Sequence, residues 1–458
     1  MTDADAWRHY PYDLVPGEPQ MRFPAAEGTH PEFQSDTWYL AGHVTGVDSG
    51  RRFAFITIFN RNRPADNIVA DFYTFALFDT DRGVYGTYTD YDMPPKNMVD
   101  GAVPKLTSAE GHLDLRYDSG AGTVLWWTNL DADGELVPYT YDYDAVGIDK
   151  DGAPMRLTLH LTPTQGPVPV GGPVHNGRIV ACLQEDTYSY FQTGLTMTGT
   201  LRWGDIAEEV HSDSAHIDRQ WFPRYAGGGG TGGDARGQAH EWHTIALDNG
   251  VDLSVWRQYD RRGANVLVPF TGITATYGDG TPPECVDDLD VTTTSYVRWP
   301  DEVRSLMKPL AQARYMPERH IVRSKTLDLE IVGEPLVRAP GHALPIEYQE
   351  GPYAYAGTMR GVPVTGVALY EASNAMYRDW ELIDVLETQI DYHQVDSAPL
   401  RDDLAAARSL IAGDDKAATM AHLDDTLRAQ LAGLAAPVSA ELTELLEGLI
   451  EAVRNDLH

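Results

Sequence analysis

The stretch Met155-Arg156-Leu157-Thr158-Leu159-His160-Leu161-Thr162 decides the fold class of this 458-residue chain. Its apolar and polar residues alternate, which is typical of an antiparallel strand with one face on a core and the other in water. The segment Asp252-Leu253-Ser254-Val255-Trp256-Arg257-Gln258-Tyr259 alternates in the same way. By contrast, Phe53-Ala54-Phe55-Ile56-Thr57-Ile58-Phe59 is largely apolar on both faces and predicts a strand buried on both sides.

Short segments of this kind fill the chain from about residue 36 to about residue 375. Turn pairs such as Asp133-Gly134, Asn249-Gly250 and Asp279-Gly280 separate them. The spacing between strands is too short for crossover helices, which argues against a parallel α/β sheet. The sequence therefore predicts a mainly β protein with antiparallel strands.

After about residue 376 the pattern changes to that of helices. Ser397-Ala398-Pro399 predicts a helix start, with proline in the first turn. Further along, apolar residues fall on one helical stripe: Leu442, Leu445, Leu446, Leu449, Ile450 and Val453. This stripe predicts packing against the β units or within a small helical bundle; a dimer interface or a cover for a pocket is the alternative.

The charge balance narrows the range of partners. The chain has 35 Lys and Arg against 68 Asp and Glu, a formal net charge of −33. This charge argues against nucleic acid and anionic membrane surfaces as partners, because both attract clustered Lys and Arg. No apolar stretch approaches the roughly 20 residues of a membrane-spanning helix, so we expect no membrane insertion.

Cysteine content and the first residues bear on the compartment. The segment 1–7 has neither the basic nor the apolar part of a signal peptide. With only two cysteines, Cys182 and Cys285, this predicts a cytoplasmic protein with reduced thiols; a disulfide between the two is a minor alternative. Their spacing provides no four-ligand Cys/His zinc framework.

Several segments follow one another in the order of a known family. They are His30–His43 (HPEFQSDTWYLAGH), Asp186–Leu195 (DTYSYFQTGL), His216–Trp221 (HIDRQW), and Glu350–Tyr353 (EGPY) with Gly361–Gly366 (GVPVTG). In this order the chain resembles the hydroxyneurosporene synthase family, also called AttH-like or carotenoid-hydratase-like, which includes lipocalin-like Diels–Alder cyclases. The resemblance spans roughly residues 30 to 372.

The resemblance implies two consecutive lipocalin-like antiparallel β-barrel or sandwich units, with a ligand cavity in or between them. We place the N-terminal β unit at residues 1–205 and the C-terminal β unit at 206–375, followed by a helical extension at 376–458. Members of the family act on hydrophobic, polyene-like molecules without a cofactor. They either add water to a double bond or direct a cyclisation.

The stretch that ends at Trp221 is rich in groups that could carry chemistry. On a strand, His216, Asp218 and Gln220 share one face, whereas Arg219 and Trp221 lie on the other. A carboxylate that orients an imidazole makes an acid–base unit near neutral pH. The alternative is a structural hydrogen-bond network.

Two glutamates are further candidates for an acid. Glu371 shares a strand face with Val367 and Leu369, so poor solvation would favour its neutral form. Such an acid could protonate an alkene or donate a hydrogen bond to a carbonyl. Glu185, just before the strand of Tyr188 and Tyr190, is the second candidate. A paired or exposed structural carboxylate is the alternative for each.

No pattern predicts a cofactor. In His240-Glu241-Trp242-His243 the histidines are three apart beside a β pattern, so they would face opposite sides, and we predict no metal site. The glycine-rich loop at 227–233 lacks the strand–turn–helix frame of a nucleotide site, so we predict no nicotinamide or flavin. No nucleophile elbow is found.

Aromatic residues in or near the family-like segments predict the ligand-binding wall. Aromatic side chains with a few polar tips suit a polyene or polyketide, although a given aromatic residue more often belongs to a core than to a pocket. The candidates for substrate binding are Trp38, Tyr39, His43, Tyr188, Tyr190, Trp221, Trp242 and Tyr353.

These features lead to three functional hypotheses. The preferred one is a cofactor-independent cyclase or isomerase, Diels–Alder-type or related, acting on a lipophilic polyene or polyketide intermediate of natural-product biosynthesis. The first alternative is a carotenoid 1,2-hydratase-like lyase, with Glu371, Glu185 or Asp218 as the acid. The second is a non-catalytic lipocalin-like carrier. The expected partner is a hydrophobic small molecule, and a homodimer remains open.

Overall fold

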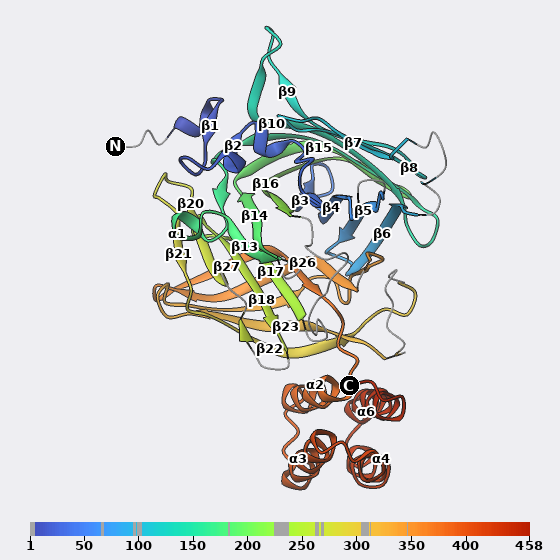
Figure 1. Ribbon diagram of the computed structural model, residues 1–458. Helices are drawn as coiled ribbons and strands as arrows, with labels where there is room; N and C mark the ends of the chain where they lie inside the picture. Colours follow the sequence, from blue (N-terminus) through green and yellow to red (C-terminus); the bar gives the residue numbers. More distant parts are fainter. Residues whose placement is uncertain are drawn as a thin grey trace.

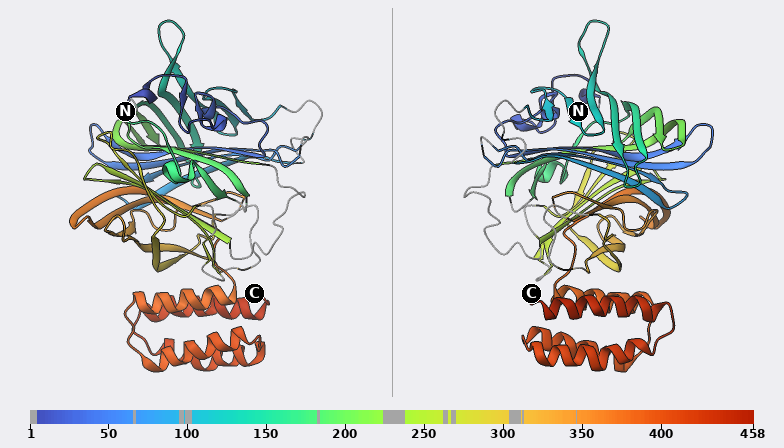
Figure 2. Two further views of the ribbon diagram at one scale, coloured as in Figure 1. Left: turned by 60° about the vertical axis from the view of Figure 1, so that its left-hand side comes forward. Right: turned by 90° about the vertical axis from the view of Figure 1, so that its right-hand side faces the viewer.

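The computed structural model describes residues 5–65, 68–94, 98, 103–181, 184–223, 238–261, 265–266, 270–303, 311, 313–345 and 347–458. Within them the chain forms two curled antiparallel β-sheets followed by helices (Figure 1). The sheets lie one above the other, and the helices form a separate layer beyond the second sheet (Figure 2). The mainly β, lipocalin-like fold predicted from the sequence is thereby confirmed.

The first sheet is built from the N-terminal half of the chain. Its strands, in spatial order, are β6 (Val84–Asp92), β5 (Asp71–Asp79), β4 (Arg52–Asn62), β3 (Ser35–Gly46), β16 (Ile206–Phe222), β15 (Leu195–Trp203), β11 (Pro154–Pro163), β10 (Leu136–Ile148), β9 (Gly122–Leu130), β8 (Asp114–Ser119) and β7 (Leu106–Ser108). The strand β14 (Gln184–Gln192) also pairs with β16 and carries β12 (Val168–Pro169) and β13 (Arg178–Ala181).

The second sheet contains the remaining long strands. In spatial order they are β21 (Glu284–Val286), β20 (Gly272–Tyr277), β18 (Val251–Asp260), β17 (Gln238–Leu247), β27 (Val362–Ser373), β26 (Tyr348–Met359), β24 (Leu329–Pro335), β23 (Tyr315–Ser324) and β22 (Leu289–Arg298). The short strands β19 (Asn265–Val266) and β25 (Gly341–His342) pair with β18 and β26.

Short elements cover the ends of the sheets. They are the ribbon of β1 (Tyr12–Asp13) and β2 (Arg22–Phe23), the single turns η1 (Ala6–Arg8), η2 (Pro19–Met21) and η3 (Ala25–Glu27), and the one-turn helix α1 (Gly172–His175).

Burial along the strands explains the patterns in the sequence. The strand β11 alternates between buried and more exposed residues, as its pattern predicts. The strand β4 is buried on both faces, because Phe53, Phe55 and Phe59 enter the first sheet's core while Ala54 and Ile56 face the second sheet. The strand β18 alternates in sequence, yet both of its faces are largely buried for the same reason: the sheets stack.

The strand β16 belongs to the first sheet. It pairs with β3, β14 and β15, and its last paired residue in the register with β3 is Phe222. The chain therefore enters the second sheet only after residue 222, and not at 206. We propose that the boundary between the two β units lies between β16 and β17 rather than at 205/206.

The C-terminal helices form a layer with its own core. They are α2 (Asp379–Tyr392), α3 (Ala398–Ala412), α4 (Lys416–Ala421), the π-helical turn η5 (His422–Leu427), α5 (Arg428–Ala432) and α6 (Val438–Arg454). The Ser397 side chain caps α3 by accepting a hydrogen bond from the Leu400 amide at 3.3 Å, as its position predicts. All six residues of the predicted apolar stripe lie in this bundle core. In the described part of the chain, no helix is both long and apolar enough to cross a membrane.

A layer of apolar side chains joins the two sheets. From the first sheet it contains Tyr39, Ala41, Ile56 and Phe78, and from the second Leu369, all of them buried. Because β3 and β16 lie in the middle of the first sheet, and β17, β27 and β26 in the middle of the second, the contact places these five strands face to face. This contact contains the cavity described next.

Candidate active site

A cavity of about 280 Å³ lies between the two sheets. Its walls combine aromatic and aliphatic side chains with a few acids and amides. The first sheet supplies Ser35, Thr37, Tyr39, Ile58, Asn60, Asn62, Phe72, Asp218, Gln220 and Phe222. The second sheet and its loops supply His240, Trp242, Trp256, Leu344, Pro345, Tyr348 and Glu371. Apolar walls with a small number of convergent polar groups are typical of a small-molecule site.

The strand β16 positions the first acid. Strand alternation turns Asp218 and Gln220 toward the cavity and Arg219 toward the core of the first unit, as the sequence predicts. The Asp218 side chain is almost fully buried, and its Oδ2 lies 3.6 Å from Nε2 of His216. His216 and Asp218 therefore lie next to each other, as the sequence predicts, and Asp218 lines this cavity.

The strand β27 positions the second acid. The hydroxyl of Tyr348 donates a hydrogen bond to Oε2 of Glu371, and Nε2 of His240 lies 3.1 Å from Oε1. Ser373 holds His240 at two atoms. Its hydroxyl oxygen accepts the backbone N–H of His240 at 3.2 Å and lies 2.9 Å from Nδ1.

A third carboxyl, Glu350, lies directly behind the cavity wall. It is paired across the β26–β27 hairpin with Glu371 and is hydrogen-bonded to the hydroxyl of Tyr39. Glu350 is 1% exposed, and its Oε2 has no partner among the described residues. Asp218, Glu350 and Glu371 thus form one group of neighbouring acids.

Crowding of these acids determines their protonation. Burial raises the pKa of Asp218 well above its ordinary value, and the nearby Glu371 raises it further. Burial also raises the pKa of Glu350, with additional contributions from Glu371 and Asp218. Like charges this close disfavour one another, so crowding favours the neutral form of Asp218 and Glu350.

Aromatic rings of the second sheet form the wall beside Glu371, since Trp242 on β17 is paired in register with Glu371 on β27. Trp242 and Trp256 pack edge to face with ring centres 5.0 Å apart, and Trp256 stacks on His240 at 5.6 Å. The indole N–H of Trp242 donates to Ser254 at 2.9 Å, which fixes the ring. The wall can therefore hold a flat, apolar ligand against the acids.

Other predicted ligand-binding residues lie in the two cores, away from this cavity. Trp38 follows the same strand as Tyr39, so alternation points it into the first core, together with Tyr190 and Trp221. Tyr188 is partly buried and packs against that core. Tyr353 is buried in the second unit, where its hydroxyl donates to the carbonyl of Glu318 at 2.8 Å.

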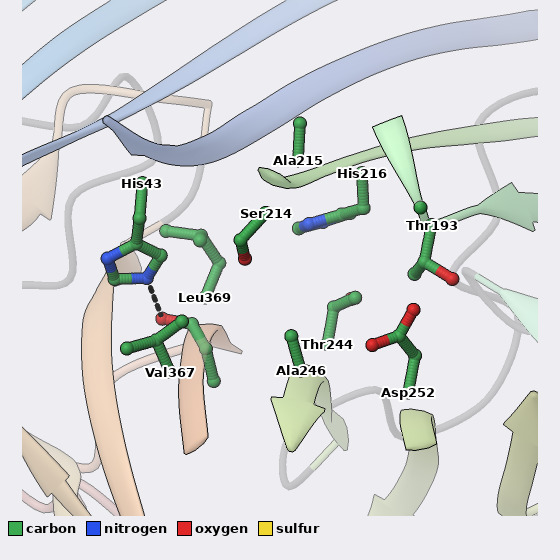
Figure 3. Close-up of a pocket in the computed structure, with 12 residues that line it drawn as sticks. His43, Thr193, Ser214, Ala215, His216, Thr244, Ala246, Asp252, Val367 and Leu369 are labelled. Atoms are coloured by element: carbon green, nitrogen blue, oxygen red, sulfur yellow. Dashed lines mark hydrogen bonds between the residues drawn. The ribbon is translucent and has the colours of Figure 1, made fainter. Parts of the chain in front are cut away.

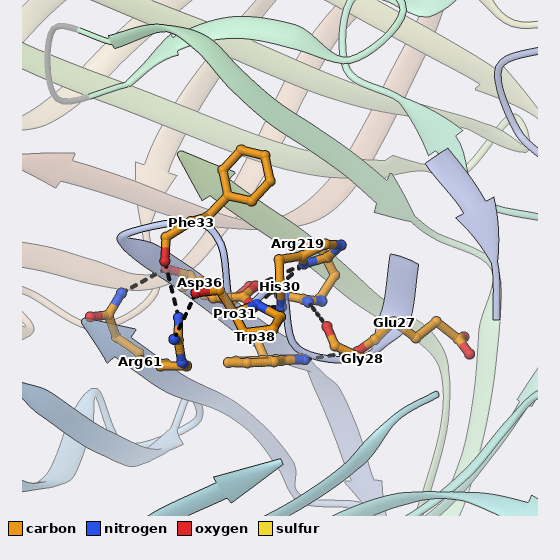
Figure 4. A network of polar contacts seen from close by, with 11 residues as sticks. Glu27, Gly28, His30, Pro31, Phe33, Asp36, Trp38, Arg61 and Arg219 are labelled. Atoms are coloured by element: carbon orange, nitrogen blue, oxygen red, sulfur yellow. Dashed lines mark hydrogen bonds and ion pairs between the residues drawn. The ribbon is translucent and has the colours of Figure 1, made fainter. Parts of the chain in front are cut away.

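The family-like segments near His30 and His216 build a polar network inside the first unit (Figure 4). Arg219 donates to Asp36 at 2.8 Å and lies 4.1 Å above the ring of Trp38. Arg219 also donates to the carbonyl of Gly28 at 2.6 Å, and the His30 ring stacks on Trp221 at 4.1 Å. These residues stabilise the first unit instead of lining the cavity.

Two candidates remain. His43 faces the second sheet, where its Nε2 lies 3.0 Å from the carbonyl of Ala368 beside a smaller cavity. The side chain of Glu185 lies outside the described part of the structure, as does the loop 227–233.

The two histidines of the segment His240–His243 point to opposite sides of their strand. His240 faces the cavity, whereas His243 is buried in the second unit and bonds to the hydroxyl of Tyr355 at 2.7 Å. Among the residues that the structure describes, no group of three or more His, Cys, Asp or Glu side chains is arranged to hold a metal ion.

The sequence reasoning named Tyr39, Trp242, Asp218 and Glu371 but missed other cavity residues. It missed Glu350, Tyr348 and His240 as part of one site. The signal for Glu350 is the two-residue turn Arg360-Gly361, with φ of 52° and 72°, which fixes the hairpin register and sets Glu350 opposite Glu371.

Two stacked lipocalin-like sheets with a ligand-sized cavity between them define the class of protein to which this chain belongs. The AttH-like family model matches residues 14–371, so the chain is a member of the AttH-like family. The match ends at the last long strand of the second sheet, before the helices.

Two solved structures have the same fold. An AttH-like protein from Nitrosomonas europaea is 19% identical, covers 80% of this chain and 100% of its own, and has a TM-score of 0.57. Kievitone hydratase from Nectria haematococca is 12% identical, covers 80% and 98%, and has a TM-score of 0.53. CghA is 14% identical, covers 80% and 97%, and reaches a TM-score of 0.37. No curated protein sequence matches this chain.

Proposed function

We propose that this protein is a cofactor-independent acid–base enzyme that adds water to a double bond of a lipophilic small molecule. The substrate class that fits the aromatic wall is a polyene or polyketide intermediate of natural-product biosynthesis. This proposal rests on the placement of Asp218 and Glu371 at one cavity, where burial raises the pKa of Asp218 and Tyr348 and His240 hold Glu371. A pericyclic ring closure requires no proton transfer, whereas hydration requires both an acid and a base.

The reaction balances with this chain's own residues. The neutral Asp218 gives its proton to one alkene carbon, so the π electrons form a C–H bond and leave a cation on the other carbon. Glu371 takes a proton from a water molecule, whose oxygen forms the new C–O bond. Tyr348 and His240 hold Glu371 in place for this step. General acid–base groups of this kind typically accelerate a reaction by about 10²–10⁴-fold.

The cavity volume also bears on the substrate. About 280 Å³ lies just below the roughly 300–1,000 Å³ range of ligand pockets. A compact ligand fits inside it, whereas a full-length carotenoid would have to extend out of the mouth. The kievitone hydratase structure shares only the fold, but its name describes the same class of reaction.

Acid-assisted ring closure is the second candidate, and the aromatic wall favours it. Trp242, Trp256 and Phe72 could press a flexible chain into a folded conformer, which supplies orientation. The neutral Asp218 would then polarise a carbonyl by donating a hydrogen bond. Both reactions need Asp218 as a donor, but only hydration needs Glu371 as a base.

The first test combines labelled water with matched variants. Lipophilic alkene precursors incubated with the protein in ¹⁸O-water should gain one labelled water. We expect Asp218→Asn and Glu371→Gln each to lower kcat by about 10²–10⁴-fold, because each removes one proton-transfer group. The exposed turn variant Asp133→Asn is the control and should leave the rate unchanged.

Two other outcomes of this experiment would contradict hydration. A product of unchanged mass that survives Glu371→Gln but not Asp218→Asn would replace hydration with ring closure. Tight binding of the precursors without any product would contradict both candidates and support a carrier.

A further inference from the structure

A second, smaller cavity lies beside the first in the contact between the sheets (Figure 3). Its volume is about 20 Å³, which is too small for an organic ligand but enough for one water molecule. Its polar lining comes from Thr193, Ser214, His216, Thr244 and Asp252. A buried water needs two to four polar partners, and this lining supplies them.

His216 stands between the two cavities. Its ring lines the small cavity and points into it in Figure 3, while its Nε2 lies 3.6 Å from Oδ2 of Asp218 at the large one. Its side chain is 6% exposed. The ring therefore faces a water-sized polar cavity on one side and Asp218 on the other.

The groups around His216 keep its ring neutral. Burial lowers the pKa of His216 to about 3, and the neighbouring His43 contributes to the decrease. The titratable groups that face it are His43 and Tyr39 on β3, Asp218 on its own strand, and Asp252 on β18, whereas β17 and β27 present Thr244 and apolar residues. A neutral imidazole carries one N–H and one lone pair, so it can receive a proton on one nitrogen and release one from the other.

Asp252 forms the outer wall of the small cavity. Its carboxyl accepts a hydrogen bond from Gln165 at 3.0 Å, and the residue is only partly buried, so it reaches solvent. Burial raises its pKa above the ordinary value. Asp252 is therefore suited to carry a proton inward.

We propose that Asp252, one water in the small cavity and His216 form a proton path that restores the acid Asp218 after each turnover. This inference rests on the proposed acid–base function. The Asp218 carboxylate takes the proton of His216 Nε2, Nδ1 takes one from the water, the water takes one from Asp252, and Asp252 takes one from solvent. A flip of the imidazole ring then returns the protonated nitrogen to the side of Asp218 before the next turnover. In the same cycle Glu371, whose side chain is 13% exposed, releases its extra proton to solvent. One proton enters and one leaves.

The test separates the first turnover from later ones. The variant His216→Phe keeps a flat ring beside Tyr39 but has no nitrogen to pass a proton. Because Asp218 starts protonated, rapid-quench measurements should show one product per enzyme at the normal rate. Later turnovers should be about 10- to 100-fold slower, with KM unchanged. Added imidazole should restore part of the steady-state rate.

A second variant protects the test against a folding defect. Asp252→Asn breaks the same path at its outer end without touching Asp218, and should show the same fast first turnover and slow steady state. Asp133→Asn is the control. A first turnover slowed as much as the steady state, or an unchanged steady state in both variants, would overturn the path. Absence of product from the wild type would instead refute the proposed function.

Discussion

Two buried aspartates on neighbouring strands show how one sheet produces opposite pKa shifts. Burial alone would raise the pKa of Asp36, but Arg219 and His30 outweigh it and hold that pKa at about 2. Asp218 has no such partner on its face of the sheet, so burial and Glu371 raise its pKa. Arg219 follows Asp218 in the sequence and points the other way. Strand alternation therefore separates the aspartate whose pKa is lowered from the one whose pKa is raised.

Glu27 makes a prediction about pH and stability. Burial raises its pKa from 4.5 to about 7, although Tyr141 and Tyr10 donate hydrogen bonds to it. The folded state therefore binds this proton more tightly than the unfolded state, and its contribution to stability is lost as the pH rises from about 4.5 through 7. The full loss is about 3 kcal/mol.

The variant Glu27→Gln tests the direction in which stability changes with pH. Gln keeps the shape of the neutral acid and cannot ionise, so its free energy of unfolding should exceed that of the wild type increasingly between pH 4.5 and pH 8. Urea unfolding of both proteins across this range measures the difference. A difference that is constant with pH, or that shrinks as the pH rises, would contradict the assignment.

At the residue level, the sequence could predict which side chains share a face but not which face meets the ligand. His216, Asp218 and Gln220 were placed together correctly because period-two alternation is local. Trp38 and Trp221 were expected at the ligand because they lie in family-like segments, yet both point into the first core. No feature of the local sequence distinguishes a side chain that enters a core from one that lines a cavity.

At the level of elements, strand pairing brings together what the sequence separates. The pairing of β16 with β3 creates the Arg219–Asp36 ion pair across 183 positions of sequence. The β26–β27 hairpin likewise places Glu350 and Glu371 opposite each other. The hairpin is predictable from its turn, whereas the β3–β16 pair is not, because a long-range register leaves no local signal.

The ion pair between β3 and β16 predicts a large effect on stability. Arg219→Met should lower the free energy of unfolding by about 3–5 kcal/mol, because it leaves the buried Asp36 without its charged partner. Adding Asp36→Asn should recover part of the loss. Chemical denaturation measures both.

A surface pair provides the matched control. Arg116 and Asp118 form an exposed ion pair at 2.8 Å, so Arg116→Met should cost no more than about 1 kcal/mol. If Arg219→Met costs as little as Arg116→Met, the buried network in Figure 4 does not stabilise the first unit as described.

At the scale of the whole molecule, the candidate site exists only because the two sheets stack. Asp218 and Tyr39 come from the first sheet, and Glu371, Tyr348 and Trp242 come from the second. The alternating segments and the family resemblance predicted two β units with a cavity in or between them. They could not determine that the cavity lies between them, because the stacking depends on the shape of both sheets together.

The central claim is that Asp218 is a neutral acid in the cavity between the sheets. Infrared difference spectroscopy of the wild type against Asp218→Asn at pH 7 tests it most directly, since a protonated carboxyl and a carboxylate absorb at different frequencies. We predict that the wild type shows a protonated-carboxyl band that the variant lacks. A difference spectrum that contains only the loss of a carboxylate band would contradict the account.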